Sequence, residues 1–291
     1  MDIGLFAPLA SPACDGAFLR ELGQTAEELG FESLWVAEHV VLFDEYASRY
    51  PYSPDGRMPG GGNGLLEPFT SLAFLAAATR RIRLGTGVCL VPQRNPVYTA
   101  KEAANVDWLS DGRLELGVGV GWLAEEFAAA GVPFARRGAR CRSYLEVMKR
   151  LWCDDVSEYS DAFYTLPACR QYPKPVQRPH PPIHFGGESD AAMRRVAALG
   201  QGWLPFDLGP DELARCTLRL KDLLARRGRN LSDIRISVSP YLRPLQADWL
   251  PRYRDAGADR VIASVFVFER AGIRPALEQL AERILEPARR I

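Results

Sequence analysis

The segment 83–122, RLGTGVCLVPQRNPVYTAKEAANVDWLSDGRLELGVGVGW, places the strongest constraint on the fold. Two short apolar runs, Ile82–Leu90 and Leu114–Val120, carry glycines near their carboxyl ends, and a stretch of helical character, Pro96–Leu109, lies between them. A strand, a crossover helix and a second strand form a βαβ unit, whose two strands are parallel. Because parallel α/β folds bind ligands at the carboxyl ends of their strands, the segment predicts both a fold and a site.

Composition and charge narrow the class of protein. Of the 291 residues, 47% are apolar and 25% are charged, which is typical of a globular domain. The 36 basic and 36 acidic residues give a formal net charge of zero, so no field of one sign favours nucleic acid or a membrane surface as a partner. Arg136, Arg137 and Arg140 are expected at the solvated edge of a helix.

The cysteines and histidines give no metal-binding pattern. Six cysteines lie at positions 14, 89, 141, 153, 169 and 216, with no CxxC pair and no histidine at metal-ligand spacing. The three histidines are His39, His180 and His184. We therefore expect no metal and six free thiols. The absence of a long apolar segment or a signal-peptide pattern favours a cytoplasmic location.

Strand-like and helix-like segments alternate along the whole chain. The expected strands are Ile3–Pro8, Ser33–Ala37, Ile82–Leu90, Leu114–Val120, Pro182–Phe185, Gly202–Pro205, Ile234–Leu242 and Arg260–Val267. Eight strands, each followed by a helix, predict a single domain over residues 1–291, folded as an α/β protein of the (β/α)8 TIM-barrel type. Insertions are expected after strand 2, at Phe43–Pro68, and before strand 5, at Asp155–Pro173. A doubly wound open sheet is the competing architecture, but its glycine fingerprint follows the first strand, whereas GVGVG here follows the fourth.

Glycines end two of the expected strands. Gly117, Gly119 and Gly121 close the fourth strand, and Gly186 and Gly187 close the fifth, just before a helix. Backbone without Cβ atoms can approach a flat ring or a phosphate closely, and a helix N-terminus favours phosphate. The structural alternative is that these glycines only make turns.

Several polar residues near the strand ends are candidates for chemistry. His39 ends the second strand in WVAEH, where an imidazole can donate or accept a proton near neutral pH, or can be a hydrogen-bonded strand-end residue. Glu38 beside it can orient the ring or point into the barrel. His184 can line the same mouth or belong to the core. Glu125 and Glu126 fall in the first turn of a helix, where acids are favoured in any case.

Five segments, in order, resemble the luciferase-like monooxygenase superfamily, in its branch of coenzyme F420-dependent oxidoreductases. They are GFESLWVAEH at 30–39, EPFTSLAFLAAATRRIRLGTGV at 67–88, RNPVYTAKEAANVDWLSDGRLELGVGVGW at 94–122, GVPFARRGAR at 131–140 and PPIHFGGESDAAMRRVAALGQGWLP at 181–205. The resemblance covers most of residues 1–205. The last third of the chain matches only in its alternation of strands and helices.

The resemblance implies a barrel that binds F420, or alternatively FMN, and transfers a hydride between the deazaflavin and a small organic substrate. It implies that His39 is the catalytic proton donor or acceptor, and that the insertion after strand 2 is a lid. A non-prolyl cis peptide behind the cofactor ring would join Gly87 to Val88. The cofactor-binding residues so implied are Glu38, Gly87, Val88, Gly119, Gly121, Glu125, Gly186 and Gly187.

Two other functions remain open. An FMN-dependent monooxygenase would need a separate flavin reductase as partner, and a non-catalytic barrel would only bind a flavin. The superfamily also implies a homodimer. Related sugar-phosphate dehydrogenases carry an acid at the position of Trp122, which argues against their substrate, and the family's usual Asp-Gly-Trp is Gln201-Gly-Trp here. The substrate itself is not identified by these residues.

Overall fold

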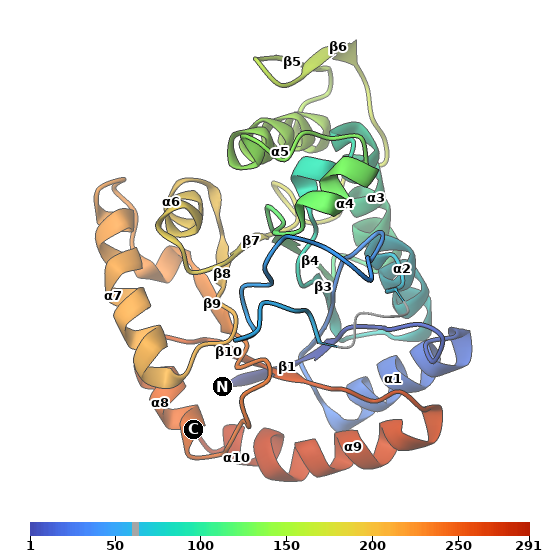
Figure 1. Cartoon of the computed structure of the whole chain (residues 1–291), viewed down its shortest axis with the longest axis vertical. Coiled ribbons are helices and arrows are strands. Elements are labelled where there is room, and N and C mark those ends of the chain that lie inside the picture. Colours follow the sequence, from blue (N-terminus) through green and yellow to red (C-terminus); the bar gives the residue numbers. More distant parts are fainter. Residues whose placement is uncertain (60–63) are drawn as a thin grey trace.

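The chain folds into a closed barrel of eight parallel strands surrounded by helices (Figure 1). The computed structural model describes residues 1–59 and 64–291, so residues 60–63 of the insertion expected at Phe43–Pro68 lie outside it. The strand order around the barrel is β1-β10-β9-β8-β7-β4-β3-β2. The predicted (β/α)8 fold is thereby confirmed.

The strands and helices follow the predicted order. The barrel strands are β1 (Asp2–Ala7), β2 (Ser33–Val36), β3 (Arg83–Thr86), β4 (Leu114–Val118), β7 (Ile183–Gly186), β8 (Gly202–Leu204), β9 (Arg235–Val238) and β10 (Arg260–Ser264). The helices are α1 (Gly16–Leu29), α2 (Pro68–Ala78), α3 (Pro96–Leu109), α4 (Ala124–Ala129), α5 (Arg137–Cys153), α6 (Asp190–Leu199), α7 (Pro210–Ala225), α8 (Trp249–Asp255), α9 (Ile273–Leu280) and α10 (Glu286–Ala288). The antiparallel pair β5 (Ser157–Ser160) and β6 (Thr165–Cys169) forms the insertion before the fifth barrel strand.

Side chains placed just before the helices determine where several of them begin. Asp15, Glu67, Asn95 and Ser189 accept hydrogen bonds from the first free N–H groups of α1, α2, α3 and α6. Prolines occupy the first position of α2 and α3, where the missing N–H costs no hydrogen bond. Local sequence therefore sets the start of the helices that follow the mouth of the barrel.

The third strand is shorter than its apolar run suggests. Ile82–Leu90 was the expected strand, but β3 ends at Thr86, and a non-prolyl cis peptide then joins Gly87 to Val88. The run stays apolar because Cys89 and Leu90 are buried although they have left the sheet. At the end of this segment, hydrophobic residues therefore indicate burial and do not indicate strand conformation.

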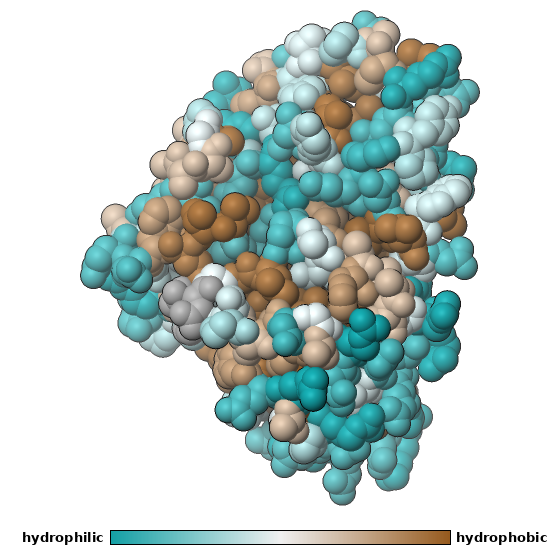
Figure 2. Space-filling view, turned by 90° about the vertical axis from the view of Figure 1, so that its right-hand side faces the viewer, coloured by the Kyte–Doolittle hydropathy of each residue, from teal (hydrophilic) through white to brown (hydrophobic). Residues whose placement is uncertain are grey.

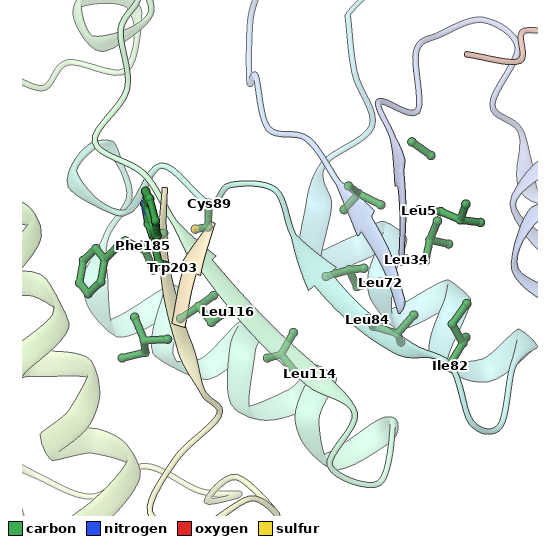
Figure 3. Close-up of a cluster of buried hydrophobic side chains, with 14 of the residues drawn as sticks. Leu5, Leu34, Leu72, Ile82, Leu84, Cys89, Leu114, Leu116, Phe185 and Trp203 are labelled. Atoms are coloured by element: carbon green, nitrogen blue, oxygen red, sulfur yellow. The ribbon is translucent and has the colours of Figure 1, made fainter. Parts of the chain in front are cut away.

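An apolar layer fills the space between the barrel and its helices. Figure 3 shows the side chains that the strands send into this layer, all of them at most 1% exposed: Leu5, Leu34, Leu84, Leu114, Leu116, Phe185 and Trp203. Fully burying one such side chain contributes about 1.5–3 kcal/mol. This layer holds the strand ends, and hence the site, in fixed positions.

The inside of the barrel contains a buried ion pair at the amino-terminal end of the strands. Arg260 of β10 and Glu115 of β4 are at most 1% exposed and form two hydrogen bonds, of 2.7 and 2.9 Å. Arg83 also binds Glu115, and Glu32 accepts a hydrogen bond of 2.8 Å from Arg260. Burial alone would raise the pKa of Glu115, but Arg260 outweighs it and holds that pKa well below its usual range. His184 Nε2 lies 3.2 Å from Glu115.

Two glycines make room for large side chains inside the barrel. A Cβ at Gly85 would lie 2.4 Å from the Trp35 ring, and one at Gly202 would lie 1.8 Å from His184 Nδ1. His184 is 1% exposed, and burial lowers its pKa to about 4. Of the two places considered for His184, the structure therefore shows the core and not the mouth.

The surface is mixed in character. Figure 2 shows the side of the molecule that carries α2 and α3, where apolar patches are separated by polar side chains. Tyr98, Trp108 and Leu109 of α3 are more than half exposed. Among the described helices none is long and apolar enough to span a membrane.

We predict that Glu115→Gln lowers the free energy of unfolding by about 3–5 kcal/mol, because the buried Arg260 loses its compensating charge. Urea unfolding followed by circular dichroism measures this loss. Glu28→Gln is the matched control, since Glu28 meets Arg274 at the surface at 2.8 Å, and its loss should be far smaller than that of Glu115→Gln. Equal losses for the two variants would contradict the structural role of the buried pair.

Candidate active site at the carboxyl ends of the strands

His39 lies just beyond β2 and forms a hydrogen-bonded pair with a carboxylate. Its Nδ1 is 3.1 Å from Oε2 of Glu126, in α4. The other oxygen of Glu126 accepts the backbone N–H of Val40 at 2.6 Å, and the glutamate is 1% exposed. An ionised carboxylate can accept hydrogen bonds but cannot donate them. His39 Nδ1 therefore carries the proton that it donates to Glu126, and Nε2 is the ring nitrogen that is free for chemistry. The sequence made Glu126 a second-choice candidate for chemistry, with a first-turn acid as the alternative, and the structure gives it a direct contact with the predicted catalytic residue.

Aromatic rings surround the His39 imidazole on one side. Trp122, which follows the GVGVG turn, meets His39 edge to face with ring centroids 5.8 Å apart. Tyr46 and Tyr50, both from the insertion after β2, pack on the same indole at 5.6 and 5.2 Å. A cavity of about 260 Å³ lies beside Trp122 and is lined by the insertion. Trp122 therefore connects the insertion to the candidate proton donor.

Val88 brings the two glycine motifs together. A Cβ at Gly119 would lie 2.4 Å from Val88 Cγ2, and one at Gly186 would lie 3.1 Å from Val88 Cγ1. Both glycines thus leave space for the valine of the cis peptide Gly87-Val88. Gly87, Val88, Gly119 and Gly186 are consequently neighbours in the mouth, although they come from three strands.

The two remaining glycines make turns with left-handed backbone. Gly121 has φ +75° and Gly187 has φ +96°, conformations that L side chains rarely adopt. The Gly187 carbonyl accepts the indole N–H of Trp203 at 3.0 Å. Gly121 and Gly187 therefore do form turns, which was the alternative to a role in cofactor binding. Their role in cofactor binding stays a prediction.

Glu38 points away from His39. Its carboxylate accepts hydrogen bonds from the backbone N–H of Leu90 and from Arg94, and Arg94 also binds Glu67 and Glu102 at 3.0 and 2.8 Å. Burial raises the pKa of Glu38 even though Arg94 opposes this. The side chain holds the segment after β3 in place, so any effect of Glu38 on a cofactor would act through that segment.

Glu125 anchors the insertion to α4. Its Oε1 accepts the backbone N–H groups of Ala47 and Ser48 at 2.7 and 3.2 Å. The Ser48 hydroxyl accepts the N–H of Ala124 in return, at 3.0 Å. Hydrogen bonds from Ser48 and its neighbour lower the pKa of Glu125 to about 2. The consecutive acids Glu125 and Glu126 thus hold two different partners, the insertion and His39.

Tyrosines of the insertion fill the mouth of the barrel. Tyr50 is 9% exposed and belongs to a cluster with Phe6 and Tyr241, against which Val88 packs. Tyr52 meets Phe206 at 4.9 Å between ring centroids. The sequence predicted an insertion without a defined element, and the structure shows that its tyrosines pack with Tyr241 and Phe206, in the cluster against which Val88 also packs.

Glu188 adds an acid to the turn after β7. Its carboxylate accepts the N–H of Phe206 at 2.6 Å. Burial raises its pKa to about 7, with the Asp207 charge adding to the effect and hydrogen bonds opposing it. Sequence reasoning noted only the glycines of GGES and did not select this residue.

The site combines a His–Glu pair, glycine turns and aromatic walls at the carboxyl end of a (β/α)8 barrel, which is where enzymes of this fold carry out catalysis. Residues 1–272 match the family model described as luciferase-like monooxygenase, and the chain belongs to that family. It is therefore an oxidoreductase of the luciferase-like class, as predicted. No group of histidines, cysteines and acids in the described residues is arranged to hold a metal ion.

Proteins similar to this chain include an uncharacterised protein, a flavin-dependent monooxygenase and an F420-dependent reductase. An uncharacterised protein of Mycobacterium tuberculosis is 35% identical over 254 residues, 87% of this chain and 86% of that protein. The oxygenase component of the flavin-dependent trigonelline monooxygenase of Acinetobacter baylyi is 32% identical over 199 residues, 67% of this chain and 50% of that protein. The coenzyme F420-dependent tetrahydromethanopterin reductase of Methanopyrus kandleri shares the fold, with a TM-score of 0.76 at 15% identity over 98% of this chain and 99% of that chain.

We predict that Gly119→Ala destabilises the protein by about 1–3 kcal/mol, because its Cβ would press on Val88. In urea unfolding, the double variant Gly119→Ala/Val88→Ala should lose less than the sum of the two single losses, since Val88→Ala removes the opposing methyl groups. Gly16→Ala is the control, because its Cβ would make only an ordinary 3.4 Å contact with Phe74. Strictly additive losses would show that Val88 and Gly119 do not compete for space.

We predict that Glu188 makes the protein less stable as the pH rises. Its folded-state pKa of about 7 lies above the ordinary value of 4.5. The contribution of Glu188 to the free energy of unfolding is therefore full below pH 4.5 and is lost as the pH rises through 7. The loss is at most about 3 kcal/mol, at 1.36 kcal/mol for each pH unit. Glu188→Gln should therefore have a higher unfolding temperature than the wild type at pH 8, with the gap closing toward pH 4.5. A gap of constant size across this range would contradict the raised pKa.

Proposed function

We propose that the protein is an F420-dependent oxidoreductase that transfers a hydride between the deazaflavin and a small organic substrate, with His39 as proton donor or acceptor. The observation that carries the proposal is the pair of His39 and the buried Glu126 beside the predicted cofactor site. A histidine with one nitrogen held by a carboxylate presents the other nitrogen in a defined direction. Storage of a flavin would not require such an arrangement.

The residues present fit a planar cofactor with an anionic side chain. Val88 offers a partly exposed apolar side chain, and Gly119 and Gly186 beside it leave main-chain groups without side chains. When bound, F420 supplies the two electrons as a hydride. Glu126 keeps the proton of His39 on Nδ1, so His39 Nε2 takes up or delivers the proton that accompanies the hydride.

The insertion after β2 serves in this proposal as the lid. Tyr50 packs in the cluster that Val88 also contacts, so a ring placed over Val88 requires this part of the insertion to move outward. Glu125 holds Ala47 and Ser48 and defines the attached end of the moving segment. Once the segment closes again, Tyr50 and Trp122 exclude water from His39.

The second candidate is an FMN-dependent monooxygenase that works with a separate flavin reductase. The observation in its favour is the 32% identity to an oxygenase component, which exceeds the identity to the F420-dependent reductase of the same fold. Both cofactors carry a planar ring and an anionic side chain, so Val88 and the glycines beside it suit either.

The deciding experiment titrates the purified protein with F420 and FMN in parallel, followed by fluorescence. We expect micromolar binding of F420, and a turnover that His39→Ala lowers about 10²–10⁴-fold with the F420 dissociation constant nearly unchanged. Turnover is scored from F420 absorbance against a panel of small alcohols and carbonyl compounds. His180→Ala is the matched control, because among the described residues its imidazole is hydrogen-bonded to the Pro181 carbonyl and packs near Trp152.

Each outcome separates the candidates. FMN binding without F420 binding would replace the first proposal by the monooxygenase. Retained binding with unimpaired turnover in His39→Ala would remove His39 from catalysis. Cofactor binding without turnover on any member of the panel, in wild type and variant alike, would favour the non-catalytic barrel.

A further inference from the structure

Exposed apolar side chains gather along one part of the rim of the barrel. The strands β2, β1, β10 and β9 are successive neighbours in the closed sheet. Large apolar side chains that are 39–62% exposed follow the carboxyl ends of β2, β9 and β10: Val40, Val41, Leu242, Phe266 and Phe268. Beyond β4 and β7 the chain turns instead at Gly121 and Gly187. Apolar surface concentrated in one place is typical of a site where a ligand or a partner binds.

A row of aromatic rings leads from this rim to the candidate proton donor. Phe266 meets Tyr241 with ring centroids 6.2 Å apart, and Tyr241 meets Tyr50 at 6.4 Å. Tyr50 meets Trp122 at 5.2 Å, and Trp122 meets the His39 imidazole at 5.8 Å. Each separation is that of rings in contact, so the row is continuous from solvent to His39. A partner protein would cover only the rim, whereas the row continues below it, which favours a small molecule as the occupant.

Tyr241 stands at the middle of the row in an unusual backbone conformation. Its φ is +55°, in the left-handed region that residues with bulky side chains rarely adopt. Its ring packs at 4.3 Å from Phe206 and at 6.2 Å from Phe6, inside the mouth. Strain of this kind persists only where the surrounding contacts enforce it, and it is concentrated at binding sites. The packing thus fixes the ring that joins the rim to the interior.

Tyr50 differs from Tyr241 and Phe266 because it belongs to the insertion after β2, whereas they follow the barrel strands β9 and β10. When the lid opens, the contact that Tyr241 makes with Tyr50 becomes free for another apolar group. We propose that the alkyl or aryl part of the substrate binds there, with Tyr241 and Phe266 as specificity-determining residues. The substrate class is therefore a small organic molecule with an extended apolar part. The inference rests on the proposed function, because it takes the reacting end of the substrate to lie at His39.

The test uses primary alcohols that differ only in length, from propanol to hexanol. Dissociation constants are measured by quenching of tryptophan fluorescence, in the purified protein with and without F420. Each added methylene that leaves water should tighten binding about threefold to fourfold. Phe266→Ala should reduce this gain to less than about twofold for each methylene, because the outer end of the row is removed. Phe266→Leu keeps an apolar side chain at the same place and should recover most of the gain.

Leu218→Ala is the matched control for these variants. Leu218 is 67% exposed on α7, so its truncation removes apolar surface away from the row and should leave the gain for each methylene as in the wild type. An equal loss of the gain in Leu218→Ala would show non-specific binding of alcohols to apolar surface and would overturn the inference.

Binding without the cofactor separates this inference from the proposed function. If the gain with length depends on Phe266 but F420 does not bind, the proposed function fails and the apolar site stands. If F420 binds and turns over while the gain with length is absent or is unchanged in Phe266→Ala, the apolar site is wrong and the proposed function stands. If no alcohol binds and Phe266→Ala converts a dimer into monomers in analytical ultracentrifugation, the rim is an interface between copies of the chain and the inference is overturned.

Discussion

The ion pair of Glu115 and Arg260 spans the inside of the barrel and ties β4 to β10 across it. The two residues belong to strands that are not neighbours in the barrel, and both lie at the amino-terminal end. Arg83 and Glu32 extend the contact to β3 and to the segment before β2. Removing these charges from water costs free energy, which the mutual hydrogen bonds offset. The opposite end of the barrel is thereby left available for a site.

At that opposite end, the side chain of Val88 packs against glycines from two motifs that are distant in the sequence. Val88 lies between Gly119 and Gly186, and larger residues at either glycine would meet its methyl groups. Val88 is itself partly exposed, so it presents an apolar surface at the mouth. Close packing against the two glycines, before any ligand is considered, determines where that surface lies.

The sequence predicted the fold closely because local signals and burial agreed along most of the chain. The helix at Pro96–Leu109 has the predicted bounds, since Asn95 and Pro96 mark its start and the SDG turn its end. The site was predicted less completely. Glu126 reaches His39, and Tyr50 reaches the mouth, through contacts between segments far apart in the chain. Arg195 lies against Gly138, where a Cβ would stand 3.0 Å from its Nη1, and no local pattern predicts such a contact.

The charged side chains around the mouth are held by different partners. Glu126 contacts His39, Glu188 accepts the N–H of Phe206, and Arg137 donates to the Gly121 carbonyl after β4. Burial raises the pKa of Glu188 to about 7, so this carboxyl is only partly ionised near neutral pH, and Val88 and Tyr241 add apolar surface to the mouth. Under the proposed function, a planar ring would lie against this apolar surface, beside the His39–Glu126 pair.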